Sequence, residues 1–310
     1  MAVLRTSRTI LGASKESSYG SAATIGTNDC MLVTEVTLTP VATDVLERTT
    51  INGFPGAKPF IQANTRVELS ATLELTPSGT AGTPPDYNEL LLGCGCVHDN
   101  QASFNTFSPE TDLSTADSLT IAVYIDGSRH LMTGARGSFS IEMSTADTPK
   151  LSFNFIGIYQ DPTATANLSP TYAQLAPTVA NAANTTGFAL HSYAGAMQSF
   201  SFEQNNNLYY SELVSSSKQV RITERASSGS VSFESVALGT KNFYPIVNST
   251  ATGNLTWQHG QTAGNKILFT APTTQLESIA QEENENYQIL NVGYRALPNA
   301  GNDEWSLKFF

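Results

Sequence analysis

The chain has 310 residues, a length that accommodates two domains of ordinary size. Charged residues make up 14% of the chain and its net charge is −11, whereas soluble proteins usually contain about 25% charged residues. An acidic chain lacks the cations that neutralise phosphates, which argues against a sequence-specific DNA-binding protein. A polar surface with few charges is expected of a subunit that packs against its own copies, and a secreted or surface β protein fits this composition equally well.

Residues 1–30 contain scattered glycine, serine and threonine with little apolar periodicity, so we expect an irregular N-terminal arm. Met1–Arg5 runs directly into polar sequence and lacks the apolar core of a signal peptide. No stretch of about 18 apolar residues occurs later in the chain. We therefore expect neither an export signal nor contact with a membrane.

The segment Glu47–Asn64 is too long for a tight hairpin and is unusually apolar, because it contains Phe54, Phe60 and Ile61. Long loops inside compact domains are usually functional or disordered. This loop could insert into a neighbouring molecule, or it could fold back onto its own core. We favour insertion, and predict that these three side chains form a contact between copies of the chain.

Apolar and polar residues alternate over 67–75, the period-2 pattern of a half-buried strand. The same alternation occurs over 139–143, 151–155 and 305–309. Asp126-Gly127 stands between two such segments and predicts a tight hairpin turn. These patterns predict an all-β fold.

One helix is well signalled. Thr83 is suited to the N-cap, Pro84 to the first helical position, and Gly93 to the C-terminus. Leu90–Leu92 would supply its buried face. We expect this helix to flank the first of two β domains, and only a single helical turn near residues 242–246 at the equivalent place in the second.

No sequence motif of a known catalytic site or cofactor site is present. Cys94 and Cys96 lie near His98, but this cluster lacks the second ligand pair of a structural zinc site. Cysteines packed at a helix end are the better interpretation. We therefore predict no catalytic residues, no metal and no cofactor, although a pair of carboxylates for glycoside hydrolysis could be hidden in a β sandwich.

The chain repeats one order of features. Val36–Leu38 precedes a polar loop and a strand from Val67, and Phe200–Phe202 precedes a similar loop and a strand from Val231, with an offset of 164 in both cases. Farther on, residues 118–163 align without a gap on 254–299, which places Gly157 on Gly293. Few aligned residues are identical, so element order and apolar pattern support the repeat. We predict a first domain at 31–163, a charge-poor linker at 164–195 and a second domain at 196–310.

Two stretches resemble the tail tube (major tail) proteins of long, non-contractile-tailed bacteriophages. The first is Lys15–Thr24, which reads KESSYGSAAT, and the second is Gly134–Phe139 followed by Pro149–Tyr159 and Pro162. These matches cover the first half of the chain. The second half matches only in its pattern, since it lacks the predicted helix and the Gly-Ala-Arg-Gly segment.

The resemblance implies β-sandwich domains that polymerise into rings around a channel for DNA. Two such domains per chain would give a ring of three chains with sixfold pseudo-symmetry. Tape measure, terminator and distal tail proteins would be the other partners, and DNA would pass without specific binding. The protein would be made in the cytoplasm of the bacterial host and reside in the tail of the virion.

A channel for DNA should have a neutral or acidic wall. Glu68 and Glu74 on the alternating strand are candidates for this wall, and a solvated outer face is the alternative for both. Two other functions fit the sequence. One is a surface adhesin or carbohydrate-binding β sandwich, and the other is a head–tail connector or tail terminator, although a single ring would not need an internal repeat.

Overall fold

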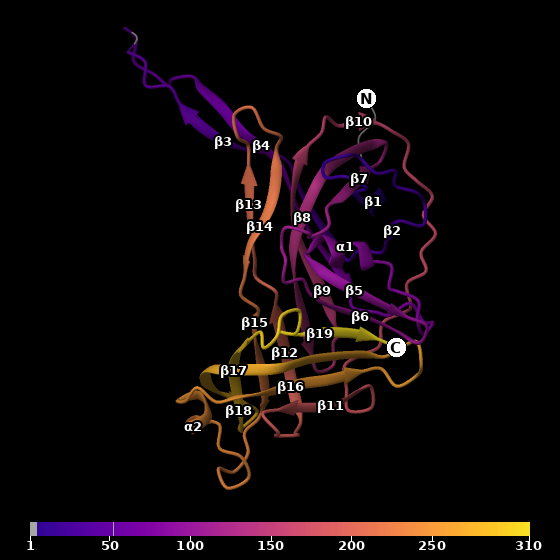
Figure 1. Ribbon diagram of the computed structural model, residues 1–310, viewed down its shortest axis with the longest axis vertical. Coiled ribbons are helices and arrows are strands. Elements are labelled where there is room, and N and C mark those ends of the chain that lie inside the picture. Colours follow the sequence, from indigo (N-terminus) through magenta and orange to yellow (C-terminus); the bar gives the residue numbers. More distant parts are fainter. Residues whose placement is uncertain (1–4, 52) are drawn as a thin grey trace.

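The computed structural model describes residues 5–51 and 53–310. Met1–Leu4, on which the expectation about a signal peptide depends, and Asn52 in the apolar loop lie outside the described residues. The described chain is built almost entirely of antiparallel strands with two short α-helices (Figure 1). The predicted all-β fold with a minor helix is confirmed.

The elements of the first half extend to residue 164. They are η1 (Thr6–Arg8), β1 (Thr9–Lys15), β2 (Cys30–Met31), β3 (Glu35–Glu47), β4 (Phe60–Glu74), α1 (Asn88–Gly93), β5 (Cys96–Gln101), β6 (Phe104–Pro109), β7 (Leu119–Ile125), β8 (Ser128–Ser144), β9 (Lys150–Tyr159) and β10 (Thr163–Ala164).

The elements of the second half begin inside the predicted linker. They are β11 (Thr185–Leu190), β12 (Met197–Glu203), β13 (Asn206–Ser211), β14 (Gln219–Arg225), β15 (Ser228–Glu234), α2 (Tyr244–Val247), β16 (Thr252–His259), β17 (Ile267–Asn284), β18 (Tyr287–Ala296) and β19 (Ser306–Phe309).

The two halves have the same strand order. In the first half the pairing runs β3–β4–β9–β8–β7–β1. In the second half it runs β12–β15–β18–β17–β16–β11. The long strands β8 and β17 therefore have equivalent places, since β8 pairs with β9 and β7, and β17 pairs with β18 and β16. In each half we call the strands that come before β8 or β17 in this order the front layer, and those that come after it the back layer.

The residue alignment made from the sequence is wrong in register. It places Gly157 on Gly293, but Gly157 is buried, whereas Gly293 lies between the inward-facing Val292 and Tyr294 and faces the other side. Val36 pairs with Ala71, and its equivalent Phe200 pairs with Val231. Ala71 rather than Val67 is thus the equivalent of Val231. Unequal hairpins and β-bulges shift the register, while the strand order is kept.

The two halves are joined by main-chain pairing. β12 of the second half pairs with the end of β8 in the first, from Ser199 opposite Ser144 to Glu203 opposite Ser140. We call this contact the internal seam. It produces one continuous sheet in the order β3–β4–β9–β8–β12–β15–β18–β17.

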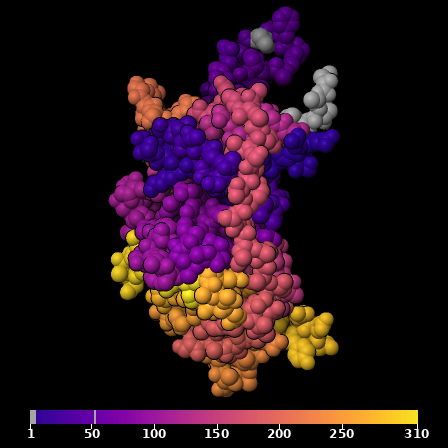
Figure 2. All heavy atoms as spheres, turned by 90° about the vertical axis from the view of Figure 1, so that its right-hand side faces the viewer, coloured from indigo at the N-terminus to yellow at the C-terminus, as the bar shows by residue number. Residues whose placement is uncertain are grey.

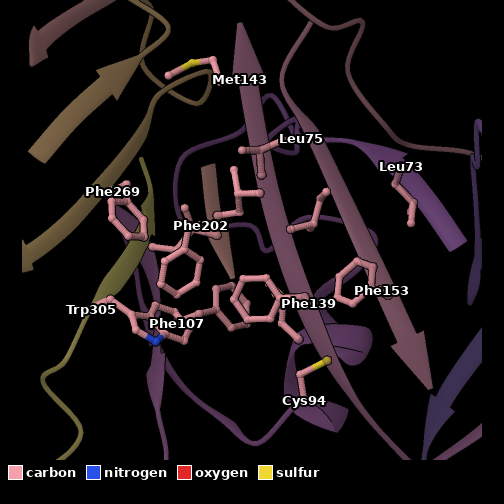
Figure 3. Packing of buried hydrophobic residues seen from close by; sticks show 14 of the residues in the cluster. Leu73, Leu75, Cys94, Phe107, Phe139, Met143, Phe153, Phe202, Phe269 and Trp305 are labelled. Atoms are coloured by element: carbon pink, nitrogen blue, oxygen red, sulfur yellow. The ribbon is translucent and has the colours of Figure 1, made fainter. Parts of the chain in front are cut away.

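A shared core lies behind the internal seam. The ring of Phe139 lies 5.9 Å from that of Phe202 and 5.4 Å from that of Trp305, which comes from the far end of the chain (Figure 3). β19 also pairs with both β17 and β6. The two halves therefore bury one continuous apolar cluster.

Two local expectations are wrong. Residues 9–15 do not belong to an irregular arm, because β1 pairs along its whole length with β7 and buries Leu11 and Ala13. The helix begins at Asn88 and not after Thr83. Pro85 follows Pro84 and disfavours helical backbone at the residue before it, so the helix can begin only farther on.

The predicted linker is ordered in its last part. β11, within 164–195, pairs with β16 and buries Phe188 and Leu190. It thereby completes the back layer of the second half, as β1 does in the first. The proposed domain boundaries stay predictions.

A buried ion pair joins the end of β14 to the segment that precedes the last strand, β19. Nε and Nη2 of Arg225 donate to the two carboxylate oxygens of Glu304, at 3.1 and 2.8 Å. Only 7% of the Arg225 side chain and 11% of the Glu304 side chain are exposed. Nη1 of Arg225 also donates to the Glu110 carbonyl at 2.8 Å, so the pair links three segments.

We predict that Glu304→Ala destabilises the protein strongly, because it leaves the buried guanidinium of Arg225 without a counter-charge. Loss of one partner of a buried pair typically costs about 3–5 kcal/mol of unfolding free energy. The control is Lys150→Ala, which removes an exposed pair with Asp147, where about 0–1 kcal/mol is expected. Urea unfolding followed by tryptophan fluorescence measures both. Equal urea midpoints for the two variants would show that the buried pair of Arg225 and Glu304 does not stabilise the protein more than an exposed pair does.

Candidate assembly surfaces

The first surface is a hairpin that projects from the body (Figures 1 and 2). β3 and β4 stay paired as far as Glu47 and Phe60, and we call residues 40–65 the first arm. Phe54 is 82% exposed, and Phe60 and Ile61, which lie on β4 rather than in the loop, are 56% and 51% exposed. The alternative in which this segment folds back onto its own core is therefore excluded.

The equivalent hairpin of the second half, β13–β14, is buried along one side, whereas its other side and its tip are exposed. We call residues 206–225 the second arm. Its Val220 and Ile222 are buried, the Tyr210 hydroxyl donates to the Thr65 carbonyl at 2.9 Å, and the Val220 N–H donates to the Tyr19 hydroxyl at 2.5 Å. Burial raises the pKa of Tyr210 to about 12. The second arm is thus docked on the first half of its own chain.

The two sequence stretches that resemble tail tube proteins meet under the second arm. The buried carboxylate of Glu16 accepts hydrogen bonds from the Gly134 N–H at 2.8 Å and the Ser118 hydroxyl at 2.7 Å. The guanidinium of Arg136 lies over the Tyr19 ring and donates to the Val220 carbonyl at 3.2 Å. Burial lowers the pKa of Arg136. These residues hold β1, β8 and the second arm together.

Two strand edges of the continuous sheet have no partner among the described residues. β3 pairs with β4 and presents its other edge to solvent. β17 pairs with β16 only as far as Gln275, so the segment Leu276–Asn284 has β18 on one side and an open edge on the other. These open edges lie at opposite ends of the continuous sheet.

The outer face of the continuous sheet is rich in hydroxyl groups. Along each strand these residues alternate with buried apolar ones, and most of them are exposed or half-exposed. We call this surface the polar face. It includes Ser70, Thr72, Ser138, Ser140, Glu142, Ser144, Lys150, Ser152, Asn154, Ser199, Ser201, Glu203, Ser228 and Ser230.

Glu68 and Glu74, the two candidates named from the sequence, lie on the same side of β4 as the polar face. Glu68 pairs with Arg66 at 2.8 Å and borders a hollow of about 350 Å³ that Leu208 of the second arm also lines. Glu74 lies directly opposite Lys150 on β9. A positive side chain therefore accompanies each of them.

Sequence reasoning missed two further carboxylates of the polar face, of which Glu142, like Glu74, lies opposite Lys150 on β9. Glu142 and Glu203 are exposed and lie diagonally across the internal seam, since Glu142 pairs with Ser201 and Glu203 with Ser140. Within residues 5–51 and 53–310 neither forms an ion pair. Each directly follows a buried apolar residue, and this alternation could have been recognised in the sequence. That the two carboxylates lie close together depends on strand pairing, which the sequence does not show.

The cysteines lie in the core. Cys94 and Cys96 are buried at the end of α1, and burial raises the pKa of the Cys96 thiol to about 12. His98 stacks on Phe107 and hydrogen-bonds to Asn105. The described part of the chain contains no cluster of three or more potential metal ligands. None of its helices is long and apolar enough to cross a membrane.

Comparison with known proteins agrees with this architecture. A protein-family model described as phage tail tube protein matches residues 6–296, nearly the whole chain and both of its halves. Among curated proteins, none matches the chain. Because the family match extends far beyond half of the sequence, this chain belongs to the phage tail tube protein family.

Proposed function

We propose that the protein polymerises into stacked rings of three chains, which form the hollow tail tube of a siphovirus through which DNA is ejected. Membership of the tail tube family makes the chain a structural component of the virion tail. The observation that carries the finer proposal is the continuous sheet, which already joins two equivalent β modules edge to edge within one chain and leaves an open edge at each end.

The chain can supply two of the repeating units of a ring. Each half contributes four strands to the continuous sheet in the same order. Three chains would supply six modules, and such a ring needs only one kind of contact between chains. Unpaired edges are a liability in a monomer, because they invite pairing with other chains, and ring closure would remove both.

The polar face is our proposed wall of the channel. It presents short hydroxyl side chains and few charges, and Glu142 and Glu203 provide negative charge at the internal seam. DNA binds proteins mainly through cations that neutralise its phosphates. A wall of this kind would let DNA pass without holding it, and in this proposal Glu68 and Glu74 lie at the margin of the wall.

The proposal includes several partner proteins and no catalytic reaction. A tape measure protein would fill the channel before DNA does, and terminator and distal tail proteins would cap the ends. The chain would be made in the host cytoplasm and act without enzyme activity, metal or cofactor. A surface adhesin or carbohydrate-binding protein is the alternative, and it would require an occupied site on a monomer rather than open sheet edges.

The deciding experiment is negative-stain microscopy of the purified protein at increasing concentration. We expect long hollow tubes. Monomers that persist at high concentration would contradict the proposal and favour the adhesin. Single rings that do not stack would favour a connector or terminator.

We predict three chains per ring. Native mass spectrometry of rings released from tubes should give a mass of three chains, and averaged cross-sections should show six similar lobes. Six chains per ring would contradict this prediction, because only one half of each chain would then belong to the repeating wall.

We predict that the first arm connects successive rings through its exposed aromatic residues. Burying one large apolar side chain contributes about 1.5–3 kcal/mol, and the contact would be repeated around the ring. Phe54→Ser combined with Phe60→Ser should give folded protein that forms rings but few tubes. The measurement is tube length in micrographs.

The matched control changes the tip of the second arm, where Leu213 is 55% and Val214 is 97% exposed. Leu213→Ser combined with Val214→Ser should leave tube length unchanged. Normal tubes from the Phe54 and Phe60 variant, or equally short tubes from both double variants, would show that the first arm has no special role in stacking.

We predict that assembled tubes bind short duplex DNA weakly, and that Glu142→Lys with Glu203→Lys creates binding that falls steeply with salt. The control, Asp99→Lys with Asp161→Lys, makes the same charge change at exposed positions outside the polar face and should bind much less. Co-sedimentation of labelled DNA with tubes at low and moderate salt measures this. Tight binding by unmodified tubes, or equal binding by both variants, would place the channel wall elsewhere.

A further inference from the structure

The internal seam is a template for the contact between chains. β12 in the second half has the place that β3 has in the first, and β8 has the place of β17. In the internal seam β12 adds to the free edge of β8. We propose that β3 of one copy pairs antiparallel with the Leu276–Asn284 segment of β17 in a second copy. This inference deepens the proposed function, on which it depends, by naming the strands that close the ring.

The burial of equivalent residues supports this pairing. Phe200 and Phe202 on β12 are 2% and 0% exposed, because β8 and β15 flank them. Val36 and Leu38 occupy the equivalent inward positions on β3, yet both are only half-buried. A strand added to the open edge of β3 would complete their burial.

The other edge shows the same deficit. Phe139 on β8, beside the internal seam, is buried, and the strand pairings give it the place that Ile279 has on β17. The places of Ile141 and Met143 are taken on β17 by the exposed Gln281 and Glu283. Ile279, at an inward position of β17 beyond Leu276, is only half-buried and packs against the edge of the core. The half-buried apolar residues therefore lie on β3 and β17. These are the strands that the internal repeat makes equivalent to β12 and β8, which form the internal seam.

The short helix beside β17 contacts the inward side of the strand. α2 packs against β17, and the hydroxyl of its Tyr244 contacts the Gln281 side chain. Gln281 lies on the inward side together with Ile279. α1 likewise packs against β8, and β8 nevertheless accepts β12. A helix on the inward side is thus compatible with strand addition at the edge.

The polar sides of the two strands also match. Thr37 lies on β3 between Val36 and Leu38 and is exposed, as Ser201 lies on β12 between Phe200 and Phe202. Ser278, Ala280 and Glu282 are exposed on the polar side of β17. Pairing would extend the polar face from one chain to the next without a break.

The test is disulfide cross-linking in assembled tubes. Thr37→Cys is combined in turn with Ser278→Cys, Ala280→Cys and Glu282→Cys, which covers the possible registers on one face. Disulfides require Cα atoms less than about 7 Å apart, a condition met on neighbouring strands about 4.8 Å apart. The native cysteines are all buried. We expect one of the three pairs to give covalent dimers and trimers, and no larger species, on non-reducing gels.

Two control pairs test whether cross-linking reports strand pairing between chains. Glu142→Cys with Ser201→Cys lies across the internal seam, so it should form a disulfide within one chain and give no larger species. Thr37→Cys with Asn291→Cys places the second thiol on β18, one strand farther away, where roughly 10 Å prevents a disulfide. This pair should give monomers only.

The outcomes separate this inference from the proposed function. Tubes that form under reducing conditions but give no intermolecular product with any of the three pairs would overturn the seam and leave the tube intact. Cross-linked products from the Asn291 pair equal to those from the other three would also overturn it. Failure of the unmodified protein to form tubes or rings would overturn the proposed function together with the seam.

Discussion

The main-chain pairing between β8 and β12 is the contact on which the rest of the structure depends. It places Phe202 against Phe139 and brings the second arm over the first half. It also determines that the polar residues of both halves lie on one side, because side chains alternate with a period of two and a slip of one residue would reverse them. Without this pairing the continuous sheet would divide into two sheets that present four open edges, instead of the two that it has among the described residues.

The two arms are equivalent hairpins, but one packs against its own chain and the other is exposed to solvent. Both extend from the front layer, as continuations of β3–β4 and of β12–β15. The second arm buries Val220 and Ile222 within its own chain, whereas the first arm exposes Phe54, Phe60 and Ile61 to solvent. Exposed apolar groups of this size are unfavourable for a free monomer and favourable for an assembling one. The difference follows from position, since only the second arm has a module of the same chain beside it.

Strands with regular alternation could be predicted from the sequence, and others could not. The pattern over 67–75 and 139–143 is strong because large apolar residues mark one face. β1 was missed because small residues, Gly12 and Ala13, occupy its centre and give no contrast. The start of α1 was predicted too early because the effect of Pro85 on the backbone of the preceding residue was not considered. The internal seam could not be predicted, because Phe200 and Phe202 indicate a buried strand without indicating its partner, and the diagonal of Glu142 and Glu203 depends on that partner.

The wall proposed for the channel uses weak interactions by necessity. A long DNA molecule passes many subunits in succession, so even a small attraction at each ring would add up along the tube. Hydroxyl groups such as Ser140 and Ser230 can stay hydrogen-bonded to water or to one another, as Ser201 and Ser230 do at 2.9 Å. At about 0.1 M salt charges act over roughly 10 Å, so the carboxylates of Glu142 and Glu203 would repel DNA only when it nears the wall. Neutral hydroxyls with sparse negative charge therefore favour passage over binding.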